Sequence, residues 1–233
     1  MADIPSSNDP TPAAPTAKSP RDNAQQSKTL ANAIATAERM IQSVLTTPDL
    51  LLALAPLGYN ELELHKGLTL FSTAQAKFNA RQEALGVATL AMKARDFAFK
   101  VAQKEFTAYR AVVQVNYRDA DRANLGASGR VPADGDKFRT TARSAYASAL
   151  QEPYLSVLSG YGFNRERLTT ALGVLDKLSA AETTYENAVS KAKVATEVRD
   201  VAAEALKSWI TKLRTIAKIT LADNPALLRL LKD

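Results

Sequence analysis

Two very long helical stretches, at residues 60–117 and 164–222, constrain the fold of this chain more than any other feature. The first contains no proline, and its apolar residues keep one heptad phase along its length. This spacing is typical of helices that pack side by side as in a coiled coil. The phase is defined by Leu64, Phe71, Ala74, Phe78, Leu85, Ala88, Met92, Phe99, Ala102, Phe106, Tyr109 and Val113. The sequence therefore predicts an all-α protein built around two long helices.

The two halves of the chain match each other at a constant offset of 104 residues, without a gap. Identical pairs extend from Thr36/Thr140 to Asp119/Asp223, and the triplet 58–60 (Gly-Tyr-Asn) matches 162–164 (Gly-Phe-Asn). A repeat of this kind indicates a pseudo-symmetric architecture. Each repeat is predicted to contain a short helix, a proline-led apolar turn, a Gly-aromatic-Asn corner and one long helical stretch.

Five segments follow from the repeat and from the turn residues. Residues 1–28 form a Pro-rich arm that is expected to be disordered unless a partner holds it. Residues 29–119 are the first helical repeat, and 120–137 are a loop rich in Gly, Pro, Asn and Asp. Residues 138–223 are the second repeat, and 224–233 form a short C-terminal helix. In the first repeat, one apolar helix face is predicted from Leu30, Ile34, Ala37, Ile41 and Val44.

Two packings of this tandem duplication are compatible with the pattern. In one, each long stretch is a single helix and the two helices run antiparallel, with short helices at the ends. In the other, each long stretch folds back near 79–86 and 183–187, which gives a compact four-helix bundle. The unbroken heptad phase favours the first packing, whereas the usual length of helices favours the second.

Composition excludes several kinds of chemistry. The chain has no cysteine, so it has no disulfide or thiolate metal site, and its single histidine, His65, argues against a histidine-dependent triad. Glu61 and Glu63 lie near His65, but acidic residues are expected at a helix start, and no metal site is predicted. No Gly-rich phosphate loop follows a strand. We therefore expect no cofactor and no catalytic residue.

The formal charge of +6 lies in the helical part of the chain, because the charges of residues 1–28 cancel. Four basic residues near the end are candidates for contact with an anion: Lys207, Lys212, Arg214 and Lys218. Such an excess is compatible with nucleic acid or an anionic membrane surface but requires neither. No apolar run approaches the ~20 residues of a membrane span, and the N-terminus lacks the features of a secretory signal. A cytoplasmic location is expected.

Several segments of the second half resemble a broad group of uncharacterised bacterial helical proteins. The resemblance is carried by Ala195-Thr196, Arg199-Asp200, Ala202, Leu206, Trp209, the ending LADNPALLRLL, and the Gly162-Phe163 corner with Arg167 and Leu168. It covers both repeats but not the N-terminal arm. It implies a helical fold and a bacterial origin, and it implies no activity.

Arg95-Asp96 and Arg199-Asp200 occupy equivalent places in the two repeats, within alanine-rich stretches. A charge in apolar surroundings needs a partner, because an unpaired buried charge is costly. We expect Arg95 to meet Asp200 and Arg199 to meet Asp96, so that these pairs fix the antiparallel register. The aromatic residues Phe97, Phe99, Phe106, Tyr109 and Trp209 are expected to pack in a core.

The alanine-rich middle of the first long stretch is apolar around nearly its whole circumference, and one antiparallel neighbour cannot cover it. The expected assembly face is Val87, Leu90, Ala91, Phe97, Ala98 and Val101. A helix that is apolar all round must be buried on more than one side.

The leading prediction is therefore a non-enzymatic structural protein that associates with itself, into filaments or a lattice. Two alternatives are a monomeric helical bundle that acts as an adaptor for another protein, and a basic helical protein that binds nucleic acid or an anionic membrane.

Overall fold

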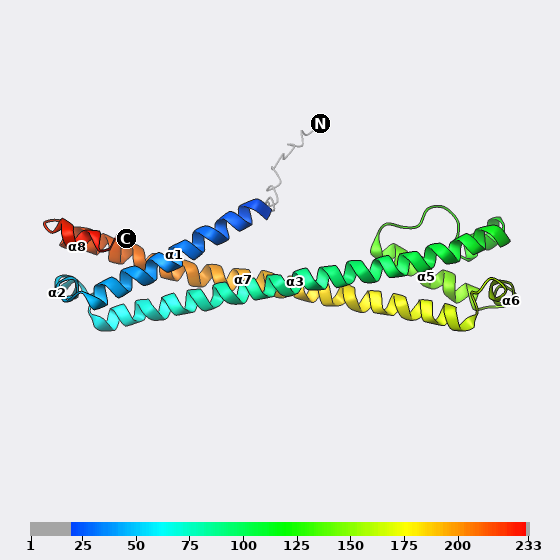
Figure 1. Ribbon diagram of the computed structural model, residues 1–233, viewed down its shortest axis with the longest axis horizontal. Coiled ribbons are helices and arrows are strands. Elements are labelled where there is room, and N and C mark those ends of the chain that lie inside the picture. Colours follow the sequence, from blue (N-terminus) through cyan, green and yellow to red (C-terminus); the bar gives the residue numbers. More distant parts are fainter. Residues whose placement is uncertain (1–19, 232–233) are drawn as a thin grey trace, which may run out of the picture. The chain divides into compact units, whose positions relative to one another are not determined.

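The computed structural model describes residues 20–231, and every regular element within them is helical (Figure 1). The elements in chain order are α1 (Pro20–Thr46), α2 (Pro48–Leu54), a 3-10 turn (Ala55–Leu57), α3 (Glu61–Asn116), α4 (Asp119–Asn124), α5 (Gly135–Ala149), α6 (Tyr154–Ser159), α7 (Arg165–Thr220) and α8 (Pro225–Arg229). The predicted all-α class is confirmed. Residues 1–19 of the expected arm lie outside the described residues. Helix α1 already begins at Pro20, before the expected boundary at 28, and proline suits the first turn of a helix.

Helices α3 and α7 each run for 56 residues without a break. They pass through 79–86 and 183–187, where the compact alternative required the chain to fold back, so that alternative is wrong. Both ends of α7 lie 104 residues after the corresponding ends of α3, which is the offset of the sequence match.

The Gly-aromatic-Asn corner before each long helix has the same local structure. Gly58 and Gly162 have positive φ angles of 94° and 82°; Gly58 directly follows the 3-10 turn, and Gly162 lies in the turn that follows α6. Asn60 Oδ1 accepts a hydrogen bond from the backbone N–H of Glu63 at 3.0 Å, and Asn164 Oδ1 accepts one from that of Arg167 at 2.9 Å. Each asparagine thereby caps the helix that follows it.

The described residues form two compact units. The first contains residues 20–76 and 200–231, and the second contains Lys77–Arg199. Within each unit a part of α3 runs antiparallel to a part of α7. Each spatial unit therefore combines segments from both halves of the sequence.

The first unit buries the apolar face predicted for α1. Ile34, Ala37, Ile41 and Val44 are all at most 2% exposed, which confirms the prediction for these four, whereas Leu30 is only half-buried. The ring of Trp209 on α7 lies against Gly67 on α3, where a Cβ atom would meet Trp209 Cη2 at 2.5 Å. The indole ring can approach this closely because residue 67 is a glycine and has no Cβ atom.

The core of the second unit is an aromatic cluster from α3, α5 and the corner before α7. The Phe106 ring centroid lies 5.6 Å from that of Phe138 and 5.7 Å from that of Tyr146, both edge to face. Tyr109 makes edge contacts with Tyr146 and Phe163. Burial raises the pKa values of Tyr109 and Tyr146. The predicted core role of Phe106 and Tyr109 is confirmed.

Arg110 holds the loop that connects α4 to α5. Its side chain is buried, and Nη2 donates to the backbone carbonyl oxygens of Ala127 at 3.0 Å and Gly129 at 2.6 Å. These charge-assisted bonds satisfy carbonyl groups that a loop would otherwise leave to water. The loop predicted over 120–137 is shorter in the structure, because residues 120–124 belong to α4 and 135–137 to α5, and the remaining loop is anchored on α3.

The inward-facing seam of α3 departs from the predicted heptad phase near its middle. Met92 was expected in the seam but is 37% exposed, whereas its neighbour Ala91 is 7% exposed. An α-helix has 3.6 residues per turn, so a strict 3.5-residue repeat drifts around it.

Among residues 20–231, no single helix is long and apolar enough to cross a bilayer. Lys28–Thr46 and Pro48–Leu57, which meet at a bend of 95°, satisfy the requirement of length and composition only as a pair. Ile41, Val44, Leu50 and Leu54 of this pair are fully buried.

Candidate functional site

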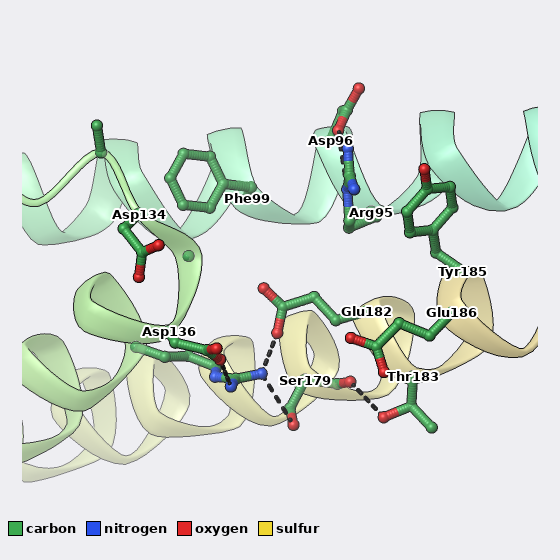
Figure 2. Close-up of a pocket in the computed structure, with 13 residues that line it drawn as sticks. Arg95, Asp96, Phe99, Asp134, Asp136, Ser179, Glu182, Thr183, Tyr185 and Glu186 are labelled. Carbon is green, nitrogen blue, oxygen red and sulfur yellow. Dashed lines mark hydrogen bonds and ion pairs between the residues drawn. The ribbon is translucent and has the colours of Figure 1, made fainter. Parts of the chain in front are cut away.

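The second unit contains an open pocket of about 530 Å³ between α3, the start of α5 and α7 (Figure 2). Five carboxylates and two guanidinium groups line it, which leaves a local formal charge of −3 in a chain whose net charge is +6. The charged residues are Arg95, Asp96, Asp134, Asp136, Arg139, Glu182 and Glu186. By charge alone the pocket would favour a cation.

Most of these charges are already paired within the pocket. Arg139 forms ion pairs with Glu182 on α7 and with Asp136 in the first turn of α5. Asp134 Oδ1 accepts a hydrogen bond from the Lys137 backbone N–H at 2.9 Å and caps α5. This network joins the start of α5 to α7. Within residues 20–231 no group of His, Asp and Glu side chains has an arrangement that could hold a metal ion.

Arg95 does not form the cross-helix register pair that we expected. Its Nη2 lies 2.6 Å from Asp96 Oδ1, and its guanidinium carbon lies 4.3 Å from the centroid of the Tyr185 ring on α7. The hydrogen bond to Asp96 raises the pKa of Arg95. The ionic partner of Arg95 is therefore its neighbour along the chain.

The antiparallel register explains why that expectation was wrong. Arg81 Nε donates to Thr196 Oγ1 at 3.3 Å. Arg95 lies fourteen residues further along α3, so its neighbours on α7 lie about fourteen residues before Thr196, in the turn that contains Tyr185. Residues related by the repeat face each other only at the midpoint of an antiparallel pair, and Arg95 is not at that midpoint. Arg199 is buried, and both it and Asp200 make interactions.

The structure divides the expected assembly face into two parts. Ala91 is buried and Ala98 is half-buried, and both turn toward the inside of the second unit. Leu90 and Phe97 are 67% and 69% exposed, and Val87 and Val101 are also exposed. Phe97 is therefore not a core residue, in contrast to our expectation for the aromatic residues.

The exposed residues of α3 form a regular row with one member that sequence reasoning missed. Ala94 is exposed and lies between Leu90 and Phe97. The row is thus Val87, Leu90, Ala94, Phe97 and Val101, with alternating spacings of three and four. We call these five residues the α3 stripe. The same spacing rule that located the inner seam could have found it.

A groove of about 410 Å³ lies in the second unit beside α7. Val194, Ala195 and Val198 of α7 line it together with Ala80 of α3, and Lys77, Ser190 and Lys191 lie at its edges. Val194 is 56% exposed and Val198 is 41% exposed. This part of α7 therefore offers a second apolar surface.

The four basic candidates for an anion site all lie on α7 in the first unit. Lys207 Nζ lies 3.4 Å from Glu204 Oε2, with both side chains largely exposed. Arg214 Nε contacts Met40 Sδ at 3.2 Å. Lys212 and Lys218 are exposed. Lys207 and Arg214 thus already contact other residues of the first unit, whereas Lys212 and Lys218 face solvent.

Glu63, considered above as a possible metal ligand, instead binds two donors in the first unit. Its Oε1 accepts a hydrogen bond from Trp209 Nε1 at 2.9 Å, and its Oε2 accepts one from Lys66 Nζ at 2.9 Å. The bond from Lys66 is the largest cause of a lowered pKa of Glu63, and that from Trp209 is the next.

This pKa shift predicts a specific acid sensitivity. Because the pKa of Glu63 is lower in the folded state than the unfolded-state value of about 4.3, the ionised carboxylate stabilises the fold at pH values above about 4.3. This stabilisation is lost as the pH falls through the folded-state pKa. Between pH 6 and pH 3, Glu63→Gln should therefore lose less thermal stability than the wild type. Fluorescence of Trp209, the single tryptophan, reports unfolding. Glu61→Gln, at an exposed carboxylate on the same turn, is the control and should follow the wild type. Equal pH dependence of all three proteins would contradict the assignment.

Comparisons of the chain with protein-family models, with curated proteins and with solved structures found no match. The expected resemblance to bacterial helical proteins is therefore supported only at the level of an all-helical chain.

Proposed function

We propose that this protein is a non-enzymatic structural protein that associates with copies of itself through the α3 stripe. The observation that carries the proposal is a row of apolar side chains exposed at three-four spacing on a long helix. Leu90 and Phe97 in its centre are each more than two-thirds exposed. Three-four spacing is the pattern with which helices pack in coiled coils, and contiguous exposed apolar surface is typical of interaction sites.

The internal repeat supports assembly rather than chemistry. Helices α3 and α7 have equal lengths and bounds separated by the offset of the sequence match, as expected if one helical unit was duplicated. A chain that contains two copies of such a unit offers related surfaces on its two long helices. Such surfaces suit proteins that pack repeatedly into filaments or lattices.

A role as an adaptor for a different protein is the alternative, because an apolar helix face also binds other helices. Binding to nucleic acid or an anionic membrane receives less support from the structure. Lys207 of the first unit already lies beside Glu204, and the pocket of the second unit is acidic.

The test compares two leucines on α3 that are exposed to the same extent. Leu90, in the stripe, is 67% exposed, and Leu62, in the first unit, is 68% exposed. Burial of a leucine or phenylalanine side chain contributes about 1.5–3 kcal/mol, so Leu90→Gln with Phe97→Gln should raise the dissociation constant of self-association at least ~10-fold. Leu62→Gln should leave it unchanged. Light scattering after size exclusion, over a range of concentrations, measures the effect.

The wild type should show a particle mass that increases with concentration. A strictly monomeric wild type at high concentration would contradict the proposal. Association that survives the double substitution would show that another surface is responsible. Circular dichroism of each variant checks that the helices remain folded.

A further inference from the structure

The α3 stripe has a cationic border. Lys93 and Lys100 lie seven residues apart, each directly before a stripe residue, and both are exposed. Within residues 20–231 neither forms an ion pair. These are the positions beside a coiled-coil seam at which charges select the partner helix. The opposite border of the stripe consists of alanines that turn toward α7.

The repeat-related positions on α7 carry the opposite charge. At the offset of 104, Lys93 corresponds to Glu197 and Lys100 to Glu204, whereas Leu90 and Ala94 correspond to Val194 and Val198. Glu197 is exposed and has no ion pair in the described part of the chain. Glu204 makes only an exposed pair with Lys207. Exposed pairs of this kind contribute little to stability, so they compete weakly with an intermolecular partner.

We propose that the α3 stripe of one copy packs antiparallel on the α7 surface around Val194 and Val198 of a second copy. This inference rests on the proposed self-association and identifies the two surfaces that meet in it. The apolar rows then interdigitate with Phe97 on Val198 and Val101 on Val194, and Lys100 lies beside Glu197. Large residues of one row meet smaller residues of the other, and the groove beside Val194 and Val198 receives the wider side chains.

The charges disfavour the pairing of two α3 stripes with each other. Two α3 stripes packed on each other would place Lys93 and Lys100 against the same lysines, whereas the α7 border carries Glu197 and Glu204 together with one exposed lysine, Lys193. Like charges across an interface weaken association, whereas opposite charges favour it and increase its rate. The occupant indicated by charge complementarity is therefore the α7 surface of another copy.

A contact between two different surfaces has a consequence for the size of the assembly. Each copy retains one unused α3 stripe or one unused α7 surface after the first contact. A heterologous contact of this kind continues into an open chain unless its rotation closes a ring. The particle mass should therefore increase progressively with concentration and not stop at a dimer.

The test reverses each border separately. Lys93→Glu with Lys100→Glu creates a chain with two acidic borders, and Glu197→Lys with Glu204→Lys creates a chain with two basic borders. Each double variant should associate at least ~10-fold more weakly than the wild type in low salt. The chain with all four substitutions exchanges the borders and should recover association to near the wild-type level. All four side chains are exposed, and circular dichroism verifies folding.

The outcomes separate this pairing from self-association in general. Wild-type association by the Glu197→Lys, Glu204→Lys chain would overturn the α3-to-α7 pairing. If Leu90→Gln with Phe97→Gln still weakened association, the proposed function would survive that result. A quadruple variant that stays as weak as the double variants would also overturn the pairing. A wild type that never associates would remove both proposals.

Discussion

Replacement of Phe106 by alanine is expected to lower the free energy of unfolding by about 3–5 kcal/mol, the usual cost of removing a fully buried phenylalanine. Phe106 is 0% exposed, and its ring contacts those of Tyr109, Phe138 and Tyr146. The substitution would leave a cavity at the point where α3 and α5 meet. Because stability is only about 5–15 kcal/mol for a typical protein, this loss would be a large fraction of the total.

Phe97→Ala is the matched control for this prediction. Phe97 lies on the same helix and in the same unit, but its side chain is 69% exposed. A surface substitution of this kind usually changes the free energy of unfolding by no more than about 0.5 kcal/mol. Urea unfolding followed by circular dichroism, at a concentration where the protein is monomeric, measures both variants. Equal effects of the two substitutions would show that the aromatic cluster is not the core of the second unit.

Gly126→Ala is expected to destabilise the protein by about 2–4 kcal/mol, through two separate effects. Gly126 has a φ of 64°, a left-handed conformation that is unfavourable for a residue with a side chain. A Cβ atom at this position would also lie 2.7 Å from the Cβ of Ala145 in α5. That methyl group is attached directly to the helix backbone, so the contact can be relieved only by moving the loop or the helix.

Gly129→Ala separates the two effects. Gly129 has a φ of 65°, nearly the same as Gly126, but the position that a Cβ atom would occupy has no atom within 4 Å apart from its chain neighbours. Its substitution should cost only about 1–2 kcal/mol, for the backbone conformation alone. Thermal unfolding by calorimetry compares the two variants. If both glycines gave the same shift, the packing of Gly126 against Ala145 would contribute nothing.

Local patterns predicted most of the helices, although α4 lies in a segment that was expected to be a loop. Pro48 and Pro225 begin short helices, and Asn224 Oδ1 accepts a hydrogen bond from the Leu227 backbone N–H at 3.3 Å, as a capping residue should. The buried face of α1 follows directly from its apolar spacing. These features depend on residues within one or two turns of each other, and therefore they can be inferred from the chain alone.

Contacts between distant segments were harder to predict. The repeat suggested that Arg95 and Asp200 would meet, but an antiparallel pair brings Arg95 beside Tyr185 instead. The ion pair of Arg139 with Glu182 joins residues 43 positions apart and leaves no local pattern. The register of two helices is decided by the packing of all their side chains together, so one pair of charges does not determine it.

The sequence by itself determined that this protein is helical, that its long helices carry apolar seams, and that its two halves correspond at an offset of 104 residues. Only the tertiary structure decided which side of each apolar segment is covered. Spacing alone placed Ala91, Ala98, Leu90 and Phe97 in one group, because all four are apolar residues of one alanine-rich helix. The course of α7 along α3 buries Ala91, half-buries Ala98, and leaves Leu90 and Phe97 in solvent. Burial is a property of the neighbours in space, and those neighbours come from the other half of the chain.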